Sequence, residues 1–238
     1  MLEMKNISKT FPGVKALKNV HFKVHRGEIM AFMGENGAGK STLIKIITGY
    51  YRRDPGAGEF YFDGKAVNPR NTDEAQRLGI STIFQELNLS PFLSVAENIY
   101  LGNTPKKNGM IDWDTMNKNA RAALLELGVD IDVTAQLSMQ STAIQQMVSI
   151  ARALSRNTKL LIMDEATSSL DTGEVKVLFD VVKGLKQKGI STIFVTHKMD
   201  EIYQVCDAAT IFKDGEYVAC MPLEELPKLK LISLMIGR

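Results

Sequence analysis

Residues 34–42 have the sequence Gly34-Glu35-Asn36-Gly37-Ala38-Gly39-Lys40-Ser41-Thr42, which matches the phosphate-binding pattern G-x-x-x-x-G-K-[ST]. The glycines allow successive backbone N–H groups to converge on phosphate oxygens. Lys40 would place its charge on the β- and γ-phosphates, and the Ser41 hydroxyl would bind Mg²⁺. An apolar predicted strand, residues 29–33, precedes the motif, and residues 40–48 have the apolar spacing of a helix whose dipole would favour the anion. This context favours a nucleotide site over an ordinary glycine-rich turn.

Short apolar runs bounded by turn residues recur along the chain and predict an α/β fold with a mostly parallel sheet. These runs are residues 29–33, 80–84, 160–163, 192–195 and 209–212. Residues 2–7, 20–24 and 59–62 alternate instead and predict a smaller antiparallel sheet on the N-terminal side. From about residue 86 to 155 strand signals are missing. A capping-box pattern at Ser94 and helical spacing over residues 115–127 and 144–154 predict an inserted helical subdomain there.

Two acidic residues end one of the predicted buried strands, the run Leu160-Leu161-Ile162-Met163-Asp164-Glu165. Ligands bind at the carboxyl edge of a parallel sheet, so Asp164 would lie near the phosphate loop and orient Mg²⁺. Glu165 would polarise an attacking water. An apolar strand that ends in acids is common by itself, and its combination with the phosphate loop predicts a nucleotide hydrolase site.

The composition excludes several classes of protein. The 238 residues include 29 Lys and Arg and 27 Asp and Glu, a net charge of +2, so we expect no nucleic-acid partner. The apolar runs are far shorter than the roughly 20 residues that span a bilayer. No secretory signal pattern opens the sequence, and Cys206 and Cys220 lack metal-ligand or redox spacing. These features predict a cytosolic domain with a single core.

Four further segments, in their order and spacing, resemble the nucleotide-binding domain of ABC transporters over essentially the whole chain. They are residues 11–17 (FPGVKAL), 84–87 (FQEL), 169–171 (SLD) and 195–198 (VTHK). More narrowly, residues 11–17, 33–42, 85–102 and 196–207 resemble the ATPases of bacterial monosaccharide importers of the galactofuranose, ribose, galactose and xylose types. The expected fold is therefore a P-loop NTPase core of the ABC type.

The resemblance implies ATP and Mg²⁺ as cofactors and assigns roles to individual residues. Phe11 would stack on adenine. Gln85 would contact the metal and couple the γ-phosphate to the helical subdomain and a membrane partner. His197 would hold the γ-phosphate and orient the water at Glu165, so Glu165, His197 and Gln85 form the expected catalytic set. Asp171 would lie at the contact between two paired domains. Taken alone, Phe11 is also typical of a core residue, Gln85 of a polar strand end and His197 of a structural histidine.

Residues 140–144, Gln-Ser-Thr-Ala-Ile, stand where the family has its Leu-Ser-Gly-Gly-Gln signature. The signature places a Ser hydroxyl and helix N–H groups on the γ-phosphate bound to the opposite domain, a role that Ser141 would have in trans. Ala143 and Ile144 replace a Gly and a Gln of the pattern, so we expect weaker activation of the partner's site. Ala166 stands where the family commonly has Pro, a minor change.

The implied function is ATP hydrolysis that powers the import of a monosaccharide, whose identity the sequence does not specify. The implied partners are a second nucleotide-binding domain in a head-to-tail pair, a transmembrane permease and, indirectly, a periplasmic sugar-binding protein. The expected location is the cytoplasm, peripheral on the inner face of the cell membrane. Importer ATPases of this type carry two such domains in tandem, so residues 1–238 are expected to be one domain, the first of the two.

Other functions with the same phosphate loop are possible. A ribosome-associated or other non-transport ABC ATPase is the main alternative. A ribosome-associated protein of this kind would be expected to carry a basic linker and a second domain, which makes it less favoured. Chromosome-maintenance ATPases separate their two nucleotide motifs by long coiled coils, whereas Asp164 follows Lys40 by 124 residues. A small-molecule kinase would not need the set formed by Gln85, Ser141 and His197.

Overall fold

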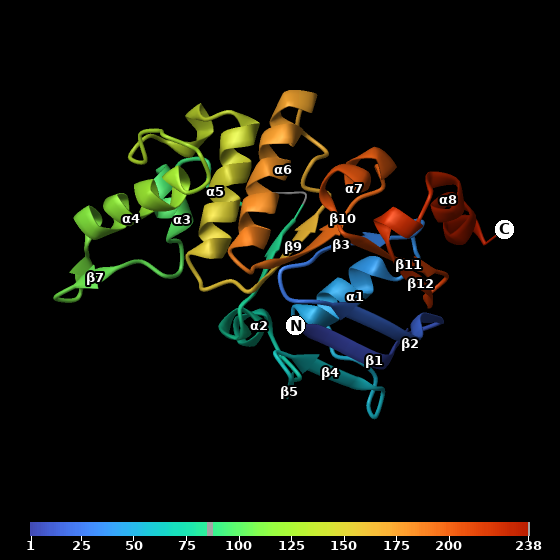
Figure 1. Ribbon diagram of the computed structural model, residues 1–238. Coiled ribbons are helices and arrows are strands. Elements are labelled where there is room, and N and C mark those ends of the chain that lie inside the picture. The colour runs from blue at the N-terminus through green and yellow to red at the C-terminus, as the bar shows by residue number, and fades with distance from the viewer. Residues whose placement is uncertain (85–87, 238) are drawn as a thin grey trace. The chain divides into compact units, whose positions relative to one another are not determined.

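The computed structural model describes residues 1–84 and 88–237, and Gln85 lies outside the described residues. The described chain divides into two compact units (Figure 1). One unit contains residues 1–82 and 159–165 and the chain from Val182 onward. The other contains residues 166–181 and the described part of 83–158.

A six-stranded sheet forms the centre of the first unit, with the strand order β12-β11-β3-β10-β9-β6. Its strands are β3 (Ile29–Met33), β6 (Ile80–Ile83), β9 (Leu160–Asp164), β10 (Ser191–Val195), β11 (Ala208–Lys213) and β12 (Glu216–Pro222). β3 pairs in parallel with β10 and β11, and β10 pairs in parallel with β9. β12 is antiparallel to β11 at one edge. The prediction of a mostly parallel sheet is confirmed, and the antiparallel edge strand was not predicted.

A four-stranded sheet with the order β2-β1-β4-β5 forms the N-terminal part of the same unit. Its strands are β1 (Leu2–Phe11), β2 (Val14–Val24), β4 (Glu59–Phe62) and β5 (Lys65–Ala66). β1 is antiparallel to both β2 and β4, as the alternating residues predict. Register shifts interrupt the β1–β2 pairing, and positive φ angles at Asn6 and Asn19 fall within these two long strands.

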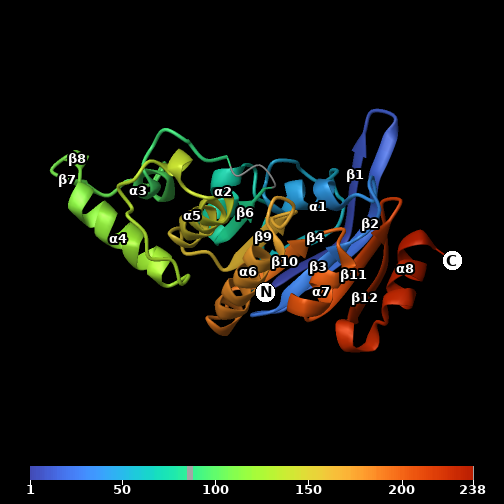
Figure 2. The same ribbon diagram turned by 90° about the horizontal axis from the view of Figure 1, so that it is seen from above.

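Helices cover both faces of the six-stranded sheet (Figure 2). α1 (Lys40–Ile47) packs into a core with residues of β1, β2 and β4 and of the large sheet, while α7 (Met199–Val205) and α8 (Lys228–Ile236) pack on the opposite face. β3 shows why both faces are apolar, since Met30 and Phe32 contact one core and Ala31 and Met33 the other. α2 (Thr72–Leu78) precedes β6, and the 3-10 turn η2 (Leu223–Glu225) precedes α8.

The second unit is mainly helical over its described residues. Its elements are α3 (Val95–Ile99), the strands β7 (Lys106–Lys107) and β8 (Met110–Ile111), α4 (Trp113–Leu125), the turn η1 (Leu137–Met139) and α5 (Thr142–Leu154), while α6 (Thr172–Gln187) is divided between the two units. The capping box at Ser94 is confirmed by both of its hydrogen bonds. The expectation that residues 86–155 contain no strand is wrong, because Asn108 and Gly109 take positive φ angles and turn the chain into the β7–β8 hairpin.

No helix of the described residues combines the length and the apolar character that crossing a bilayer requires.

Candidate active site

The phosphate-loop motif links β3 to α1, and two of its glycines are required by close backbone approaches. Gly39 has a φ of +96°, and a Cβ there would lie 2.8 Å from the Ala16 carbonyl oxygen and 2.7 Å from Leu17 Cδ2. Gly34 has a φ of +153°, and its Cβ would lie 2.4 Å from the Phe212 carbonyl oxygen. Any larger residue would therefore displace the loop from the strands beside it.

The N-terminus of α1 has no side-chain cap, since Gly39 precedes it in a left-handed conformation. Its first N–H groups therefore point out of the helix together with the positive end of the dipole. Lys40, the first residue of α1, folds back so that Nζ donates to the carbonyl oxygens of Gly34 at 2.7 Å and Glu35 at 3.0 Å. Burial lowers the pKa of Lys40, and the nearby Asp164 and Glu165 carboxylates oppose that change. The loop and its lysine thus form one electropositive, partly buried surface.

Asp164 and Glu165 stand at the carboxyl end of β9, as predicted. Asp164 is the last residue of the strand and pairs with Val195 of β10. Burial and the neighbouring Glu165 charge raise the pKa of Asp164, while Lys40 and Lys45 counteract this shift. Glu165 has a φ of +50°, and its N–H donates to the Val195 carbonyl oxygen at 3.0 Å. This turn separates the two carboxylates, so that adjacent residues can have different roles.

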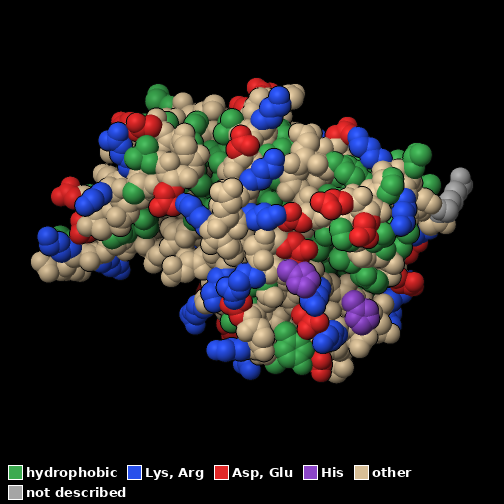
Figure 3. Space-filling view, viewed as in Figure 1, with side chains coloured by type: hydrophobic (Ala, Val, Ile, Leu, Met, Phe, Trp, Pro, Cys, Tyr) green, Lys and Arg blue, Asp and Glu red, His purple; other side chains and the backbone are tan. Residues whose placement is uncertain are grey.

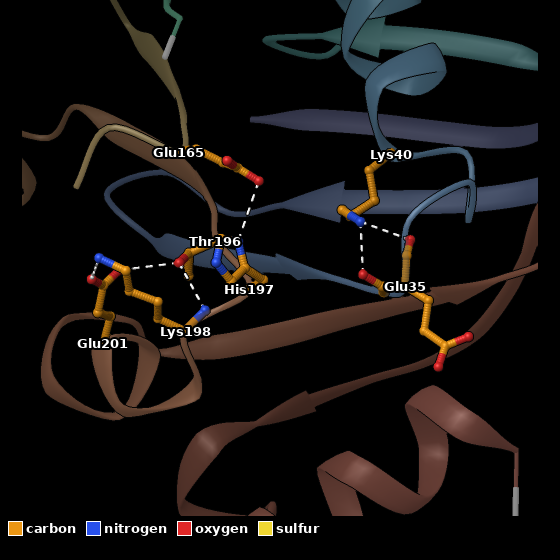
Figure 4. Close-up of polar contacts among 8 residues, drawn as sticks. Glu35, Lys40, Glu165, Thr196, His197, Lys198 and Glu201 are labelled. Atoms are coloured by element: carbon orange, nitrogen blue, oxygen red, sulfur yellow. Dashed lines mark hydrogen bonds and ion pairs between the residues drawn. The ribbon is translucent and has the colours of Figure 1, made fainter. Parts of the chain in front are cut away.

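His197 follows β10 by two residues and faces Glu165 (Figure 4). Its Nδ1 lies 3.3 Å from Glu165 Oε1. The His197 side chain is 68% exposed and that of Glu165 is 34% exposed, so water can reach both groups. The pairing of β9 with β10 therefore brings together an acid and a histidine that are 32 residues apart in the sequence.

The donor chemistry around the loop suits Mg²⁺. Ser41 offers a hydroxyl in the first turn of α1, and Asp164 offers a partly buried carboxylate in the same unit. In residues 1–84 and 88–237 no group of three or more His, Cys, Asp or Glu side chains is arranged to hold a metal ion. Mg²⁺ commonly binds through one or two protein oxygens together with substrate phosphates rather than in an all-protein cage, so this sparse donor set fits.

Phe11 is the last residue of β1, and its ring contacts neighbouring side chains. Its half-buried ring packs edge-on against Tyr51, with the ring centroids 5.1 Å apart, and Lys9 Nζ lies 5.2 Å from its centroid. Sequence reasoning missed Tyr51, and the Tyr50-Tyr51 pair shortly after α1 was an available signal. The role of Phe11 in stacking on adenine stays a prediction.

Ser141 and Asp171 belong to the second unit, and both cap helices. Ser141 Oγ accepts the N–H of Ile144 at 3.4 Å at the start of α5. Asp171 Oδ1 accepts the N–H groups of Gly173 at 2.7 Å and Glu174 at 2.8 Å at the start of α6. Both residues are exposed, and their roles toward a second domain stay predictions, as does the role of Gln85.

Charged side chains of both signs are interspersed over the face shown in Figure 3, and apolar atoms appear in small groups between them. This distribution agrees with the net charge of +2. The electropositive character of the phosphate loop is therefore local, since it comes from Lys40, Lys45 and the helix terminus rather than from a field of the whole surface.

Known proteins resemble the chain over its whole length. It is 48% identical over 238 residues to the galactofuranose transporter ATP-binding protein YtfR of Escherichia coli (strain K12), and 49% identical to the arabinose import ATP-binding protein AraG of Vibrio parahaemolyticus. It is 46% identical to the galactose/methyl galactoside import ATP-binding protein MglA of Salmonella typhimurium. Each match covers 100% of this chain and 47% of the relative, so the chain spans about half the length of these proteins.

Solved structures agree in fold. The ADP conformation of an ATP-binding cassette of an ABC transporter superimposes with a TM-score of 0.86 at 29% identity, covering 100% of this chain and 99% of the other. A dimeric post-hydrolysis cassette bound to ADP and phosphate gives 0.78 at 28% identity, covering 94% and 99%. The sequence profile of the ABC transporter family matches residues 17–168, which include the phosphate loop, Ser141 and the two acids at the carboxyl end of β9. The chain therefore has the fold of an ATP-binding cassette and belongs to the ABC transporter family.

Proposed function

We propose that this chain binds and hydrolyses MgATP as the ATPase part of a monosaccharide importer. The observation that carries the proposal is the contact between Glu165 and His197 in the same compact unit as the phosphate loop and Asp164. The site combines an anion-binding helix terminus, a metal-binding oxygen set and an acid–histidine pair. The first two would bind the triphosphate and its metal, and the acid–histidine pair would position and polarise the attacking water.

Nucleotide binding would use the loop and the residues around it. Backbone N–H groups of residues 34–42 would hold the phosphates, and Lys40 would turn from the loop carbonyls toward the β- and γ-phosphates. Phe11 would stack on the adenine ring. Ser41, Gln85 and Asp164 would hold Mg²⁺, which neutralises charge on the phosphates when it is bound.

Hydrolysis would use Glu165 and His197. The Glu165 carboxylate would accept a hydrogen bond from the attacking water and so increase the electron density on the water oxygen. The exposed His197 ring would contact the γ-phosphate with one nitrogen while the other stays toward Glu165. Their separation of 3.3 Å leaves the two groups able to act on one water molecule between them and the phosphate.

Catalysis would need a second nucleotide-binding domain. Ser141 would contact the γ-phosphate of that domain, and Asp171 would lie at the contact between the two. The solved dimeric cassettes support pairing of two such domains, for which we propose the head-to-tail mode. The relatives' greater length is compatible with a tandem arrangement, in which residues 1–238 would be the first domain.

The transport role is inferred from the relatives, whose names give galactofuranose, arabinose and galactose as the sugars. The partners would be a transmembrane permease, contacted through the segment after Gln85, and indirectly a periplasmic sugar-binding protein. The domain would then work on the inner face of the membrane. The specific sugar would be chosen by the permease and the binding protein.

The test is the ATPase rate per molecule as a function of protein concentration. Because one domain suffices for binding and two are needed for catalysis, the rate per molecule should rise with concentration while ATP affinity stays constant. A fast rate that does not depend on concentration would contradict the pairing. Co-purification with a polytopic membrane protein supports transport, and co-purification with ribosomes instead would favour a non-transport ABC ATPase.

A further inference from the structure

The residues on both sides of His197 are fixed by one buried carboxylate (Figure 4). Glu201, in the first turn of α7, is only 7% exposed. Its Oε2 accepts the Thr196 hydroxyl at 3.0 Å, and its Oε1 lies 3.2 Å from Lys198 Nζ. The Thr196 hydroxyl oxygen also accepts the N–H of Lys198 at 3.0 Å.

The His197 side chain has the opposite environment. It is 68% exposed, whereas the Thr196 residue before it is 4% exposed. Glu201 and Thr196 therefore hold the backbone at residues 196–198 from inside the protein, while the imidazole extends outward to Glu165. The direction of the ring follows from the backbone that these internal contacts fix.

We propose that Glu201 is a positioning residue for hydrolysis, which acts by holding residues 196–198 so that His197 faces Glu165. This inference rests on the proposed function for its catalytic consequence. The geometric part concerns the protein alone. Glu201 contacts Thr196 and Lys198 and would touch neither the substrate nor the reacting water.

The chemistry of the cluster explains why a carboxylate is used. A single carboxylate can accept the hydroxyl of Thr196 with one oxygen and pair with the ammonium of Lys198 with the other. An amide would keep one acceptor oxygen and would offer donors where Lys198 also donates. Removal of the side chain would leave a buried hydroxyl without its acceptor and free the segment to shift. A displacement of about 1 Å at a reacting group can cost about 10²-fold in rate.

Steady-state kinetics test the proposal. Glu201→Ala should lower kcat for ATP by about 10- to 100-fold with KM for MgATP changed less than about twofold, and Glu201→Gln should give a smaller loss. In a His197→Ala background, Glu201→Ala should have no further effect, because it acts through His197. Asp200→Ala is the matched control, since Asp200 is in the same helical turn, pairs with Lys228 and should leave kcat unchanged. Equal losses in both backgrounds would overturn the proposal.

A second measurement does not depend on turnover. Proton–carbon NMR of the histidine rings should show the His197 signal moving when Glu165→Gln is introduced into the otherwise unchanged protein. The same change should move it less in Glu201→Gln protein, which keeps one acceptor for Thr196, and not at all in Thr196→Val protein, in which the hydroxyl that joins Glu201 to the segment is lost. An identical response in all three backgrounds would overturn the positioning role even if Glu201→Ala fails to fold. Absence of any ATPase activity with a normal NMR response would instead refute the proposed function and leave the geometric inference standing.

Discussion

The N-termini of α1 and α5 contrast in how their free N–H groups are satisfied. α1 follows Gly39, has no side-chain cap and begins with a lysine. α5 follows Ser141, whose hydroxyl accepts the N–H of Ile144, although at the long distance of 3.4 Å. Both helices begin at a motif that the family resemblance assigns to phosphate, and only one of them leaves its N–H groups without a cap from its own chain.

The difference indicates two kinds of phosphate site. In the loop before α1, Gly34 and Gly39 lie so close to the backbone of neighbouring strands that no larger residue fits. The loop is therefore preorganised for an anion within its own unit. The N-terminus of α5 is capped by a weak hydrogen bond to its own Ser141. A phosphate bound to another domain could replace this bond with a small loss of free energy. This agrees with binding in one domain and activation by another, and it can be tested residue by residue.

The largest effect is expected from Glu165→Gln, which removes the charge that polarises water and keeps the shape of the side chain. Turnover should fall by about 10² to 10⁴-fold while ATP binding is retained. Single-turnover hydrolysis together with equilibrium ATP binding measures both. Normal hydrolysis by this variant would show that the water is activated elsewhere and that the α1 site is not organised as described.

The next effect concerns Lys40→Met, which removes the charge at the α1 terminus and keeps much of the apolar stem. ATP affinity should fall by about 10- to 100-fold, because a hydrogen bond to a charged group contributes about 1.5–3 kcal/mol. Competition with a fluorescent ATP analogue measures the change, and Lys230→Met, an exposed lysine of α8, serves as the control. Equal affinity in both variants would place the phosphates away from the loop.

A smaller and more selective effect is expected from Ser141→Ala. Loss of an N-cap costs about 0.5–2 kcal/mol, and the long bond at Ser141 places this variant near the lower end. Turnover at high protein concentration should fall while the ATP affinity of dilute protein stays unchanged. Chemical denaturation, binding and concentration-dependent ATPase assays separate these effects. A change in ATP affinity of dilute protein would place Ser141 at the site of its own domain and remove the contrast between the two termini.

The smallest effect is expected in the pH dependence of stability, to which Asp164 contributes. Because the native pKa of Asp164 is raised above its ordinary value of 3.8, the native state binds more protons than the unfolded state between these two values. The contribution of Asp164 to the free energy of unfolding therefore decreases as pH rises through that window. Asp164→Asn should be more stable than the parent protein above the window and should bind ATP with little dependence on magnesium. Urea unfolding from about pH 4 to 7 checks the sign.

Sequence patterns predicted the elements whose signals are local. The apolar runs predicted strands β3, β6, β9, β10 and β11 with ends shifted by at most one residue. The motif placed Gly34 and Gly39 correctly in a loop between a strand and a helix, and Lys40 at the start of that helix. The capping pattern at Ser94 also depends on neighbouring residues and is confirmed. Short-range chemistry decides all of these features.

Features that hydrophobic periodicity does not reveal were missed. β12 is an edge strand with partly exposed residues and lacks a clear apolar pattern. The packing of Phe11 on Tyr51 joins residues from different elements, and Glu201 was recognised only as part of a family-like segment. α4 begins at Trp113, two residues before the predicted start, because Asp112 caps it. In each case the deciding contact is a strand pairing, a ring contact, a side-chain hydrogen bond or a helix cap, none of which produces a periodic apolar pattern.

The most direct test of the central claim is an amide NMR titration with MgADP. The backbone N–H groups of residues 37–42 should give the largest chemical-shift changes, and those of residues 142–145 at the start of α5 should change little in dilute protein. Omission of magnesium should reduce the changes, because Asp164 then contributes no metal contact. Unchanged signals at residues 37–42 with MgADP, or larger changes at residues 142–145, would contradict a phosphate site built on the loop before α1.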